Sequence, residues 1–362
     1  MSDAVLITGA TGFVGMEVLA RYLERSERPV VALVRAESDA GARERVDGVL
    51  ANLFGARASE FGGRVEAVAG ELTSPSLGMD AGRCRRLAKR VGTIVHSAAS
   101  VSFTLPLGEA RAINVEGTQR MLEFAGSCPE LDRYAHVSTA YVAGTHAGRF
   151  GEEDALVGQS FHNTYERSKL EAEQLVRGAG LPWTIMRPSI VVGDTHSGWT
   201  SAFNVLYWPL RAFARGLFTA VPAIPDAPVD VVSIDYVADG VYELCSSGAD
   251  GCYHLTAGAD ASTIGEIAAA ASTYFKRPLP EVIPPDEFSD GDGAVVDGSR
   301  AYFPYFSVSS LFDDTRARAL LRPAGIRVTP LRDYMDRLLD FATQSRWGKR
   351  PIGRAEALLA AA

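Results

Sequence analysis

Two polar side chains in the middle of the sequence have the types and spacing needed for acid–base chemistry on a carbonyl group. Tyr165 and Lys169 occur as Y-x-x-x-K within the stretch NTYERSKLEAE, which has helical periodicity. Residues four apart share one face of a helix, so the ammonium should lie near the phenol and lower its pKa. A tyrosine of this kind can exchange a proton with a substrate oxygen. An exposed tyrosine beside a lysine paired with Glu166 or Glu173 would have the same spacing.

Two hydroxyl side chains precede this pair in the chain. Ser138 and Thr139 end the apolar stretch in HVSTAYVAG. A hydroxyl at a strand end can donate a hydrogen bond to a carbonyl oxygen, as an oxyanion hole does. Because side chains alternate along a strand, we expect only one of the two to face the reacting group.

Three glycines near the start of the chain have the spacing of a nucleotide cradle. The stretch VLITGATGFVGMEVL places them between an apolar strand and a helix. Gly9 would permit a sharp turn, Gly12 would let a pyrophosphate approach the backbone, and Gly15 would let helix and strand pack closely. The helix N-terminus supplies free N–H groups to the phosphate. A simple tight turn also uses glycine, but a position after the first strand of an alternating chain favours the cradle.

The second strand ends in a cation rather than a carboxylate. An NAD site usually has Asp or Glu there, to bind the ribose hydroxyls. This chain has Arg35, whose guanidinium can bind a 2′-phosphate through several donors. The sequence therefore predicts NADPH. Arg43 and Arg45 follow on the next helix and either reach the same phosphate or face solvent.

The elements that would position these residues alternate between strand and helix in the first half of the chain. Such alternation predicts a doubly wound parallel sheet with helices on both faces, the α/β class. The expected strands cover residues 4–8, 29–35, 64–70, 91–99, 133–140 and 182–188, and the expected helices cover 13–23, 39–54, 83–90, 110–126 and 161–178.

The alternation stops after Pro188. Residues 193–228 are rich in aromatic residues and proline and have no clean period, whereas 229–234 and 253–258 again look like strands. We therefore expect a nucleotide-binding domain over 1–192, with 229–258 returning to it. A smaller mixed α/β substrate lobe would comprise 193–228 and 259–362, ending in a loosely held helical tail.

Composition limits the possible partners. The chain has 362 residues and a net charge of −8 without a basic block, which disfavours nucleic acid. Its four scattered cysteines show no metal-binding spacing, so we expect no metal and reduced thiols. No signal peptide or membrane-spanning apolar run is apparent, which predicts a cytoplasmic protein. A peripheral membrane contact through the apolar stretch 203–221 and a homodimer stay open.

Several of these motifs together resemble the extended short-chain dehydrogenase/reductase family, whose nucleotide-binding domain has the Rossmann fold. They are TGATGFVG, HSAA, NVEGT, VSTAYV, YERSK and RPSIVVGD. The stretches LVRA, STAYV, RPSIV, SGW and VDVVSIDYVAD are similar to those of the fatty acyl-CoA reductase and thioester reductase branch.

The resemblance implies roles for individual residues. Tyr165 and Lys169 match the catalytic tyrosine and lysine, and Thr139 matches the catalytic Ser/Thr. Asn114 resembles the asparagine that holds a proton-relay water, although a helix kink or cap is an equal alternative. The expected cofactor contacts are Gly9, Thr11, Gly12, Phe13, Val14, Gly15, Arg35, Arg45, Glu71, Leu72, Ser97, Ala98, Ala99, Lys169, Pro188 and Ile190. The expected substrate contacts are Ser138, Tyr141, Trp199, Phe203 and Tyr207.

The resemblance also implies a reaction. NADPH would reduce a hydrophobic acyl thioester, on coenzyme A or an acyl carrier protein, to an aldehyde and possibly an alcohol, with Tyr165 as proton donor. A ketone or aldehyde reductase like the hydroxysteroid dehydrogenases is the first alternative. A sugar-nucleotide epimerase or dehydratase is less compatible with Arg35. A non-catalytic NADPH sensor would not need Thr139, Tyr165 and Lys169 together.

Overall fold

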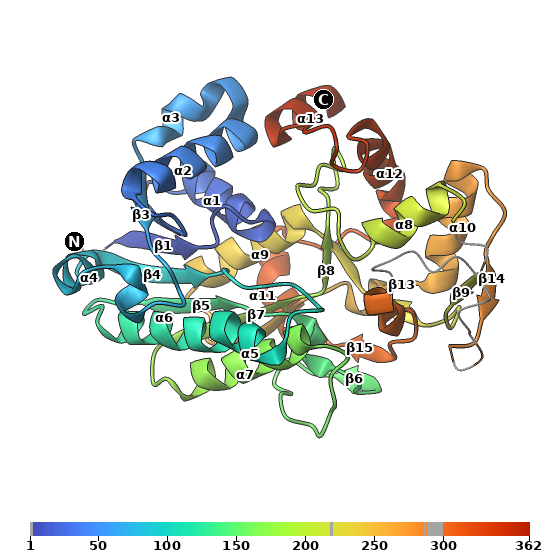
Figure 1. Cartoon of the computed structure of the whole chain (residues 1–362), viewed down its shortest axis with the longest axis horizontal. Helices are drawn as coiled ribbons and strands as arrows, with labels where there is room; N and C mark the ends of the chain where they lie inside the picture. Colours follow the sequence, from blue (N-terminus) through green and yellow to red (C-terminus); the bar gives the residue numbers. More distant parts are fainter. Residues whose placement is uncertain (1–2, 218–219, 286, 288–299) are drawn as a thin grey trace.

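A seven-stranded parallel sheet forms the centre of the computed structural model, which describes residues 3–217, 220–285, 287 and 300–362 (Figure 1). The strand order is β12-β7-β5-β4-β1-β2-β3. The strands are short and apolar, and β1, β2, β4 and β5 are buried along their whole length, as expected for a sheet covered on both faces. Their bounds are β1 Ala4–Thr8, β2 Val30–Val34, β3 Val65–Ala69, β4 Val91–His96, β5 Arg133–Val137, β7 Trp183–Pro188 and β12 Gly251–Leu255.

Alternate residues of each strand point to opposite faces of the sheet, and each face has its own core. Val5 and Ile7 of β1 pack with α1 (Phe13–Arg25), α2 (Asp39–Phe54), α9 (Ile234–Ser246) and α11 (Thr315–Leu321). Leu6, between them, packs toward α4 (Ala81–Ala88), α6 (Gly117–Gly126) and α7 (Thr164–Gly178). The predicted α/β doubly wound class is therefore confirmed.

The sheet order reverses between β1 and β4, which are neighbours although β2 and β3 come between them in the sequence. Connections from the two strands leave in opposite directions, so a crevice opens at their carboxyl ends. The glycine turn after β1 and the small residues after β4 meet at this crevice.

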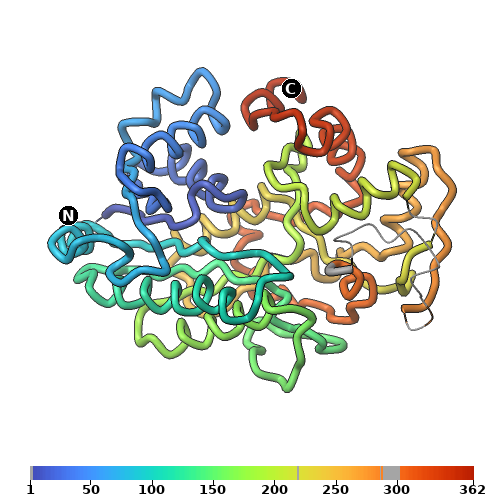
Figure 2. The backbone as a smooth tube through the Cα atoms, viewed as in Figure 1, coloured from blue at the N-terminus to red at the C-terminus, as the bar shows by residue number. Residues whose placement is uncertain are grey.

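A second lobe lies beside the carboxyl ends of the strands (Figures 1 and 2). Its core is rich in aromatic side chains, including Tyr207, Phe213 and Tyr305. Its helices are α8 Tyr207–Ala214, α10 Ile264–Phe275 and α12 Met335–Gln344. Short strand pairs lie in this lobe and at its border: β6 Gly148–Phe150 with β15 Ser310–Phe312, β8 Ile190–Val192 with β11 Val231–Ser233, β9 Ala220–Pro222 with β14 Glu281–Ile283, and β10 Pro228–Val229 with β13 Ser262–Thr263.

The last helix differs from the expected loose tail. Helix α13 (Arg354–Ala361) packs against α2 at the blue end of the fold (Figure 2). The Arg354 guanidinium lies 2.8 Å from the carboxylate of buried Glu17, and the Arg354 amide donates to Asn52 Oδ1 at 2.9 Å. The ion pair between elements far apart in sequence holds this helix, and no local pattern encodes it.

The cysteines match the expectation of reduced thiols. All four cysteines are free thiols, and three of them are buried. Among the residues with described positions, no helix combines the length and apolar character needed to cross a bilayer.

The expected helix over 110–126 is instead three segments, α5 (Leu107–Arg111), a π turn (Ala112–Glu116) and α6.

Candidate active site

One cavity of about 620 Å³ runs along the carboxyl ends of the central strands and into the second lobe. All of the predicted cofactor contacts line it: Gly9, Thr11, Gly12, Phe13, Val14, Gly15, Arg35, Arg45, Glu71, Leu72, Ser97, Ala98, Ala99, Lys169, Pro188 and Ile190. Thr139, Tyr165, Ser138 and Tyr141 line the same cavity. The fold thus brings together residues that lie as far apart in the chain as Thr8 and Tyr305.

Two glycines of the turn after β1 have no room for a side chain. Gly9 has φ +72°, and a Cβ there would lie 2.8 Å from the backbone nitrogen of Ala98. A Cβ on Gly15 would lie 2.0 Å from the Gly9 carbonyl oxygen. No side chain caps α1, which starts after Gly12, so the amides of its first turn stay available to an anion.

Two arginines border the end of the cavity next to β2. Arg35 follows the strand with its side chain exposed, and Arg45 projects from α2. The Arg45 guanidinium donates to Thr11 Oγ1 at 3.2 Å and to the Arg35 carbonyl oxygen. Arg43 does not line the cavity, because it pairs with Asp47 and donates to the Val65 carbonyl. Arg43 therefore follows the solvent-facing alternative.

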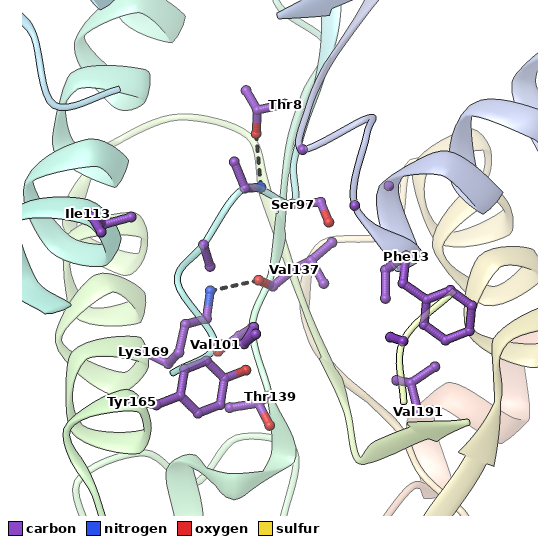
Figure 3. Close-up of a pocket in the computed structure, with 18 of the residues that line it drawn as sticks. Thr8, Phe13, Ser97, Val101, Ile113, Val137, Thr139, Tyr165, Lys169 and Val191 are labelled. Carbon is purple, nitrogen blue, oxygen red and sulfur yellow. Dashed lines mark hydrogen bonds between the residues drawn. The ribbon is translucent and has the colours of Figure 1, made fainter. Parts of the chain in front are cut away.

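Helix α7 carries the two candidate acid–base groups. Figure 3 shows Tyr165 and Lys169 projecting from it toward the chain segment that holds Val137 and Thr139. The Lys169 ammonium donates to the Val137 carbonyl at 2.8 Å and lies 3.4 Å from His136 Nε2. Lys169 is only 2% exposed, and burial lowers its pKa to about 8. It is still mainly protonated at neutral pH.

The pKa of Tyr165 is shifted in the direction opposite to the expected one. Burial raises the pKa of the phenol to about 12, and a hydrogen bond with the Thr139 hydroxyl only partly offsets this shift. The Lys169 ammonium is bonded to a carbonyl oxygen, and the nearby Glu166 carboxylate raises the tyrosine pKa further. The phenol therefore holds its proton at neutral pH.

Ser138 and Thr139 both line the cavity. The strand ends at Val137, and Thr139 caps a short 3₁₀ turn by accepting from the Tyr141 amide at 3.2 Å. Both residues follow the end of the strand, so the alternation of side chains along a strand does not place them on opposite sides. The Ser138 hydroxyl is buried and has no hydrogen-bond partner in the structure, which leaves its donor available to a ligand.

Asn114 lies behind the cavity wall, within the π turn. Its Oδ1 accepts from the Ser100 amide at 2.8 Å, and its Nδ2 donates to Ser168 Oγ at 2.9 Å. These bonds connect the loop after β4 to α7. The kink alternative thus describes the local backbone, and the side-chain amide is already engaged by the protein.

Three expected substrate contacts do not line the cavity. Trp199 is buried against Phe13, with ring centroids 5.8 Å apart, and its indole donates to the Ile352 carbonyl at 3.1 Å. The Tyr207 hydroxyl accepts from the Gly193 amide at 2.9 Å, and Phe203 packs on the Tyr207 ring. Aromatic residues suit a core as well as a binding site, so their type alone could not separate the two.

Other residues that line the cavity lie outside the motifs from which the site was predicted. Phe103 packs on the Tyr165 ring, with centroids 5.8 Å apart, and Val205 and Tyr305 come from the second lobe. The aromatic stretch AYFPYF at 301–306 was the available sequence signal for Tyr305.

The sequence was compared with known families and proteins. A family profile described as Male sterility protein matches residues 7–241. The chain is 30% identical over 272 residues to fatty acyl-CoA reductase 1 of Xenopus laevis, covering 65% of this chain and 53% of that protein. It is 31% identical over 284 residues to carboxylic acid reductase of Mycobacterium marinum, covering 69% of this chain and 24% of that protein. The chain thus spans about half of the first of these relatives and a quarter of the second.

The structure resembles solved reductase domains over nearly its whole length. The terminal R domain from the myxalamid PKS-NRPS biosynthetic pathway superposes with a TM-score of 0.82 at 24% identity, covering 97% of this chain and 93% of that one. The reductase (R) domain of a nonribosomal peptide synthetase from Mycobacterium tuberculosis has a TM-score of 0.74 at 23% identity, with the same coverage. The chain belongs to the Male sterility protein family.

Proposed function

We propose that this chain is an NADPH-dependent reductase that converts a hydrophobic acyl thioester to an aldehyde. The observation that carries the proposal is a single cavity that joins the glycine turn to Tyr165, Thr139 and Lys169. The names of the relatives, a fatty acyl-CoA reductase and a carboxylic acid reductase, support acyl groups as the substrate class.

The residues of the cavity fit a nicotinamide dinucleotide. A Cβ on Gly9 or Gly15 would collide with backbone atoms, and the first turn of α1 offers uncapped amides to a pyrophosphate. Arg35 and Arg45 would bind a 2′-phosphate, and the residue after β2 is no carboxylate that would repel one. Such a cofactor, when bound, would supply the hydride.

The remaining roles follow from the protonation states of this chain. Tyr165 keeps its proton at neutral pH and is the proton donor to the substrate oxygen. The hydroxyls of Thr139 and Ser138 donate hydrogen bonds to the same oxygen. The buried Lys169 ammonium would hold the cofactor ribose and would contribute positive charge beside the reacting oxygen.

The reaction balances as a two-electron reduction with loss of a thiol. Addition of a hydride to the thioester carbon and of a proton to its oxygen gives a hemithioacetal. The carbon–sulfur bond then breaks, the sulfur takes a proton, and an aldehyde and a free thiol leave. A second hydride and proton would convert the aldehyde to the alcohol.

The test is to follow NADPH absorbance and free thiol together, with dodecanoyl-CoA as substrate. Equal loss of NADPH and gain of thiol supports thioester reduction to the aldehyde, and two NADPH per thiol indicates the alcohol. The Tyr165→Phe variant should lose about 10²–10⁴-fold in kcat. NADPH loss without thiol, seen only with added ketones or aldehydes, would replace the proposal with the ketone-reductase alternative.

A further inference from the structure

A second, apolar pocket of about 100 Å³ lies next to the catalytic cavity, between α8 and α10. Phe213 of α8 and Ile267, Ala268 and Ala271 of α10 form part of its wall. Of the described residues that line it, none is charged. The pocket shares Ile190, Val205 and Tyr305 with the catalytic cavity, so the two spaces are neighbours across these side chains.

Tyr305 forms the wall between the two spaces and is fixed at both ends. Its hydroxyl donates to Glu166 Oε1 at 2.5 Å and accepts from Asn163 Nδ2 at 2.8 Å. Its ring stacks on Phe103 at 5.3 Å between centroids and meets Tyr141 edge-on at 5.0 Å.

Glu166 gives this wall a direct connection to the catalytic helix. It is completely buried and follows Tyr165 in the chain, and its second oxygen accepts from the His162 amide at 2.8 Å. The Tyr305 side chain is therefore positioned by the same helical turn that presents the proton donor. A substitution in this wall can therefore also move Tyr165. Its effect on chain-length preference and its effect on the reaction are measured separately.

The size of the catalytic cavity limits what it can hold. Its lining runs from Arg45 to Tyr165, so a dinucleotide that reaches both ends would extend along the cavity and share it with the substrate. A long acyl chain needs further space that is apolar and adjoins the catalytic cavity, and the pocket beyond Tyr305 has both properties.

Resting on the proposed function, we infer that the apolar pocket holds the distal methylenes of the acyl chain and that Tyr305 determines the chain length accepted. Val205 at the same junction has φ +42°, a conformation that a β-branched residue seldom adopts. The backbone is thus constrained at the place where the acyl chain would turn from the catalytic cavity into the apolar pocket.

The test uses two substitutions on adjacent residues of α10. Ala268→Phe fills the pocket without touching the catalytic cavity, whereas Ala269→Phe places the same ring on the exposed side of the helix. Butanoyl-, octanoyl-, dodecanoyl- and hexadecanoyl-CoA are compared by kcat/KM. Each buried methylene is worth about a fourfold gain in affinity, so filling the pocket should lower kcat/KM for the long chains by at least tenfold. The short-chain values and the A269F profile should match the wild type.

A binding assay separates the pocket from the reaction. The fluorescent fatty acid cis-parinaric acid should bind the wild type and A269F and lose at least tenfold affinity in A268F. If no thioester is reduced but the probe shows this pattern, the proposed function fails and the pocket stands. If thioesters are reduced and A268F leaves both the chain-length profile and the probe unchanged, the inference is wrong and the function stands.

A second pair of variants covers the case in which A268F does not fold. Tyr305→Ala joins the two spaces and should shift the preferred chain length upward, whereas Tyr305→Phe keeps the ring and removes its bonds to Glu166 and Asn163. Y305F should retain the wild-type order of chain lengths. An identical shift in Y305F and Y305A would mean that the hydrogen bonds, and not the wall, set the preference.

Discussion

At the scale of single residues, burial sets the chemistry of the candidate active site more than neighbouring charge does. Lys169 and Tyr165 share a helical face, yet each titrates according to its own surroundings. Burial raises the pKa of the phenol and lowers that of the ammonium. His136 lies against Lys169 and is itself neutral, because burial and the ammonium hold its pKa well below the usual range. The four-residue spacing is consistent with both side chains lining one cavity, but spacing contains no information on burial depth.

The lowered pKa of Lys169 predicts an alkaline limit to activity. The ammonium faces His136 of β5 and Glu173 of its own helix, and its pKa is about 8. It is charged below that pH and loses its proton as pH rises through 8. We expect kcat/KM to fall over this interval. In Lys169→Arg, which stays protonated there, activity should be lower but should not fall near pH 8. If kcat/KM of K169R still falls near pH 8, the titration of another group causes the fall.

The two arginines beside β2 should determine cofactor preference. Removing the Arg45 side chain deletes a donor that is already held at the cavity by Thr11. Arg45→Ala is expected to raise KM for NADPH on the order of tenfold and to leave KM for NADH unchanged. Arg43→Ala is the matched control, because that side chain pairs with Asp47 outside the cavity. Equal losses with both cofactors would contradict a role in binding the 2′-phosphate.

At the scale of elements, the strands and helices of the first half follow from local pattern, and the exceptions have tertiary causes. The expected helix over 39–54 and strand over 4–8 match α2 and β1 residue for residue. The π turn does not follow from local pattern, because it depends on bonds from Asn114 to Ser100 and Ser168. Helix α8 had no readable period, since tryptophan, proline and phenylalanine occupy several of its faces.

The glycine turn gives the sharpest prediction at this scale. In Gly15→Ala the added methyl group would lie 2.0 Å from the Gly9 carbonyl oxygen, so the turn must open. We expect a loss of about 1–3 kcal/mol in the free energy of unfolding and weaker NADPH binding by at least tenfold. Chemical denaturation and cofactor titration measure the two effects.

Gly48→Ala is the control for the general effect of replacing a glycine by alanine within a helix. Gly48 lies on the exposed side of α2, and nothing stands within 4 Å of an added Cβ. That variant should be more stable by about 0.5–1 kcal/mol, because glycine is unfavourable inside a helix. If G15A bound NADPH as tightly as G48A, close packing at Gly15 would not be what shapes the cradle.

At the scale of the whole molecule, the last helix stabilises the first. Arg354 pairs with Glu17, which is 2% exposed and whose pKa is raised by burial. Arg354→Ala leaves this carboxylate with Arg21 as its remaining cation, and we expect a loss of about 1–3 kcal/mol in stability at neutral pH. The loss should shrink at acidic pH, where Glu17 is protonated. Thermal unfolding at two pH values checks both statements, and a pH-independent loss would point to helix packing instead.

The sheet itself is completed late in the chain. Strand β12, at 251–255, forms its outer edge against β7, and α9 and α13 cover α1 and α2. During vectorial synthesis, residues 1–192 leave the ribosome before any of these elements exist. The nascent chain then exposes an open strand edge and the apolar face of α1, both of which are surfaces that chaperones bind. We therefore expect productive folding of residues 1–192 to wait for the second half of the chain, and a fragment cut at residue 192 to aggregate rather than fold.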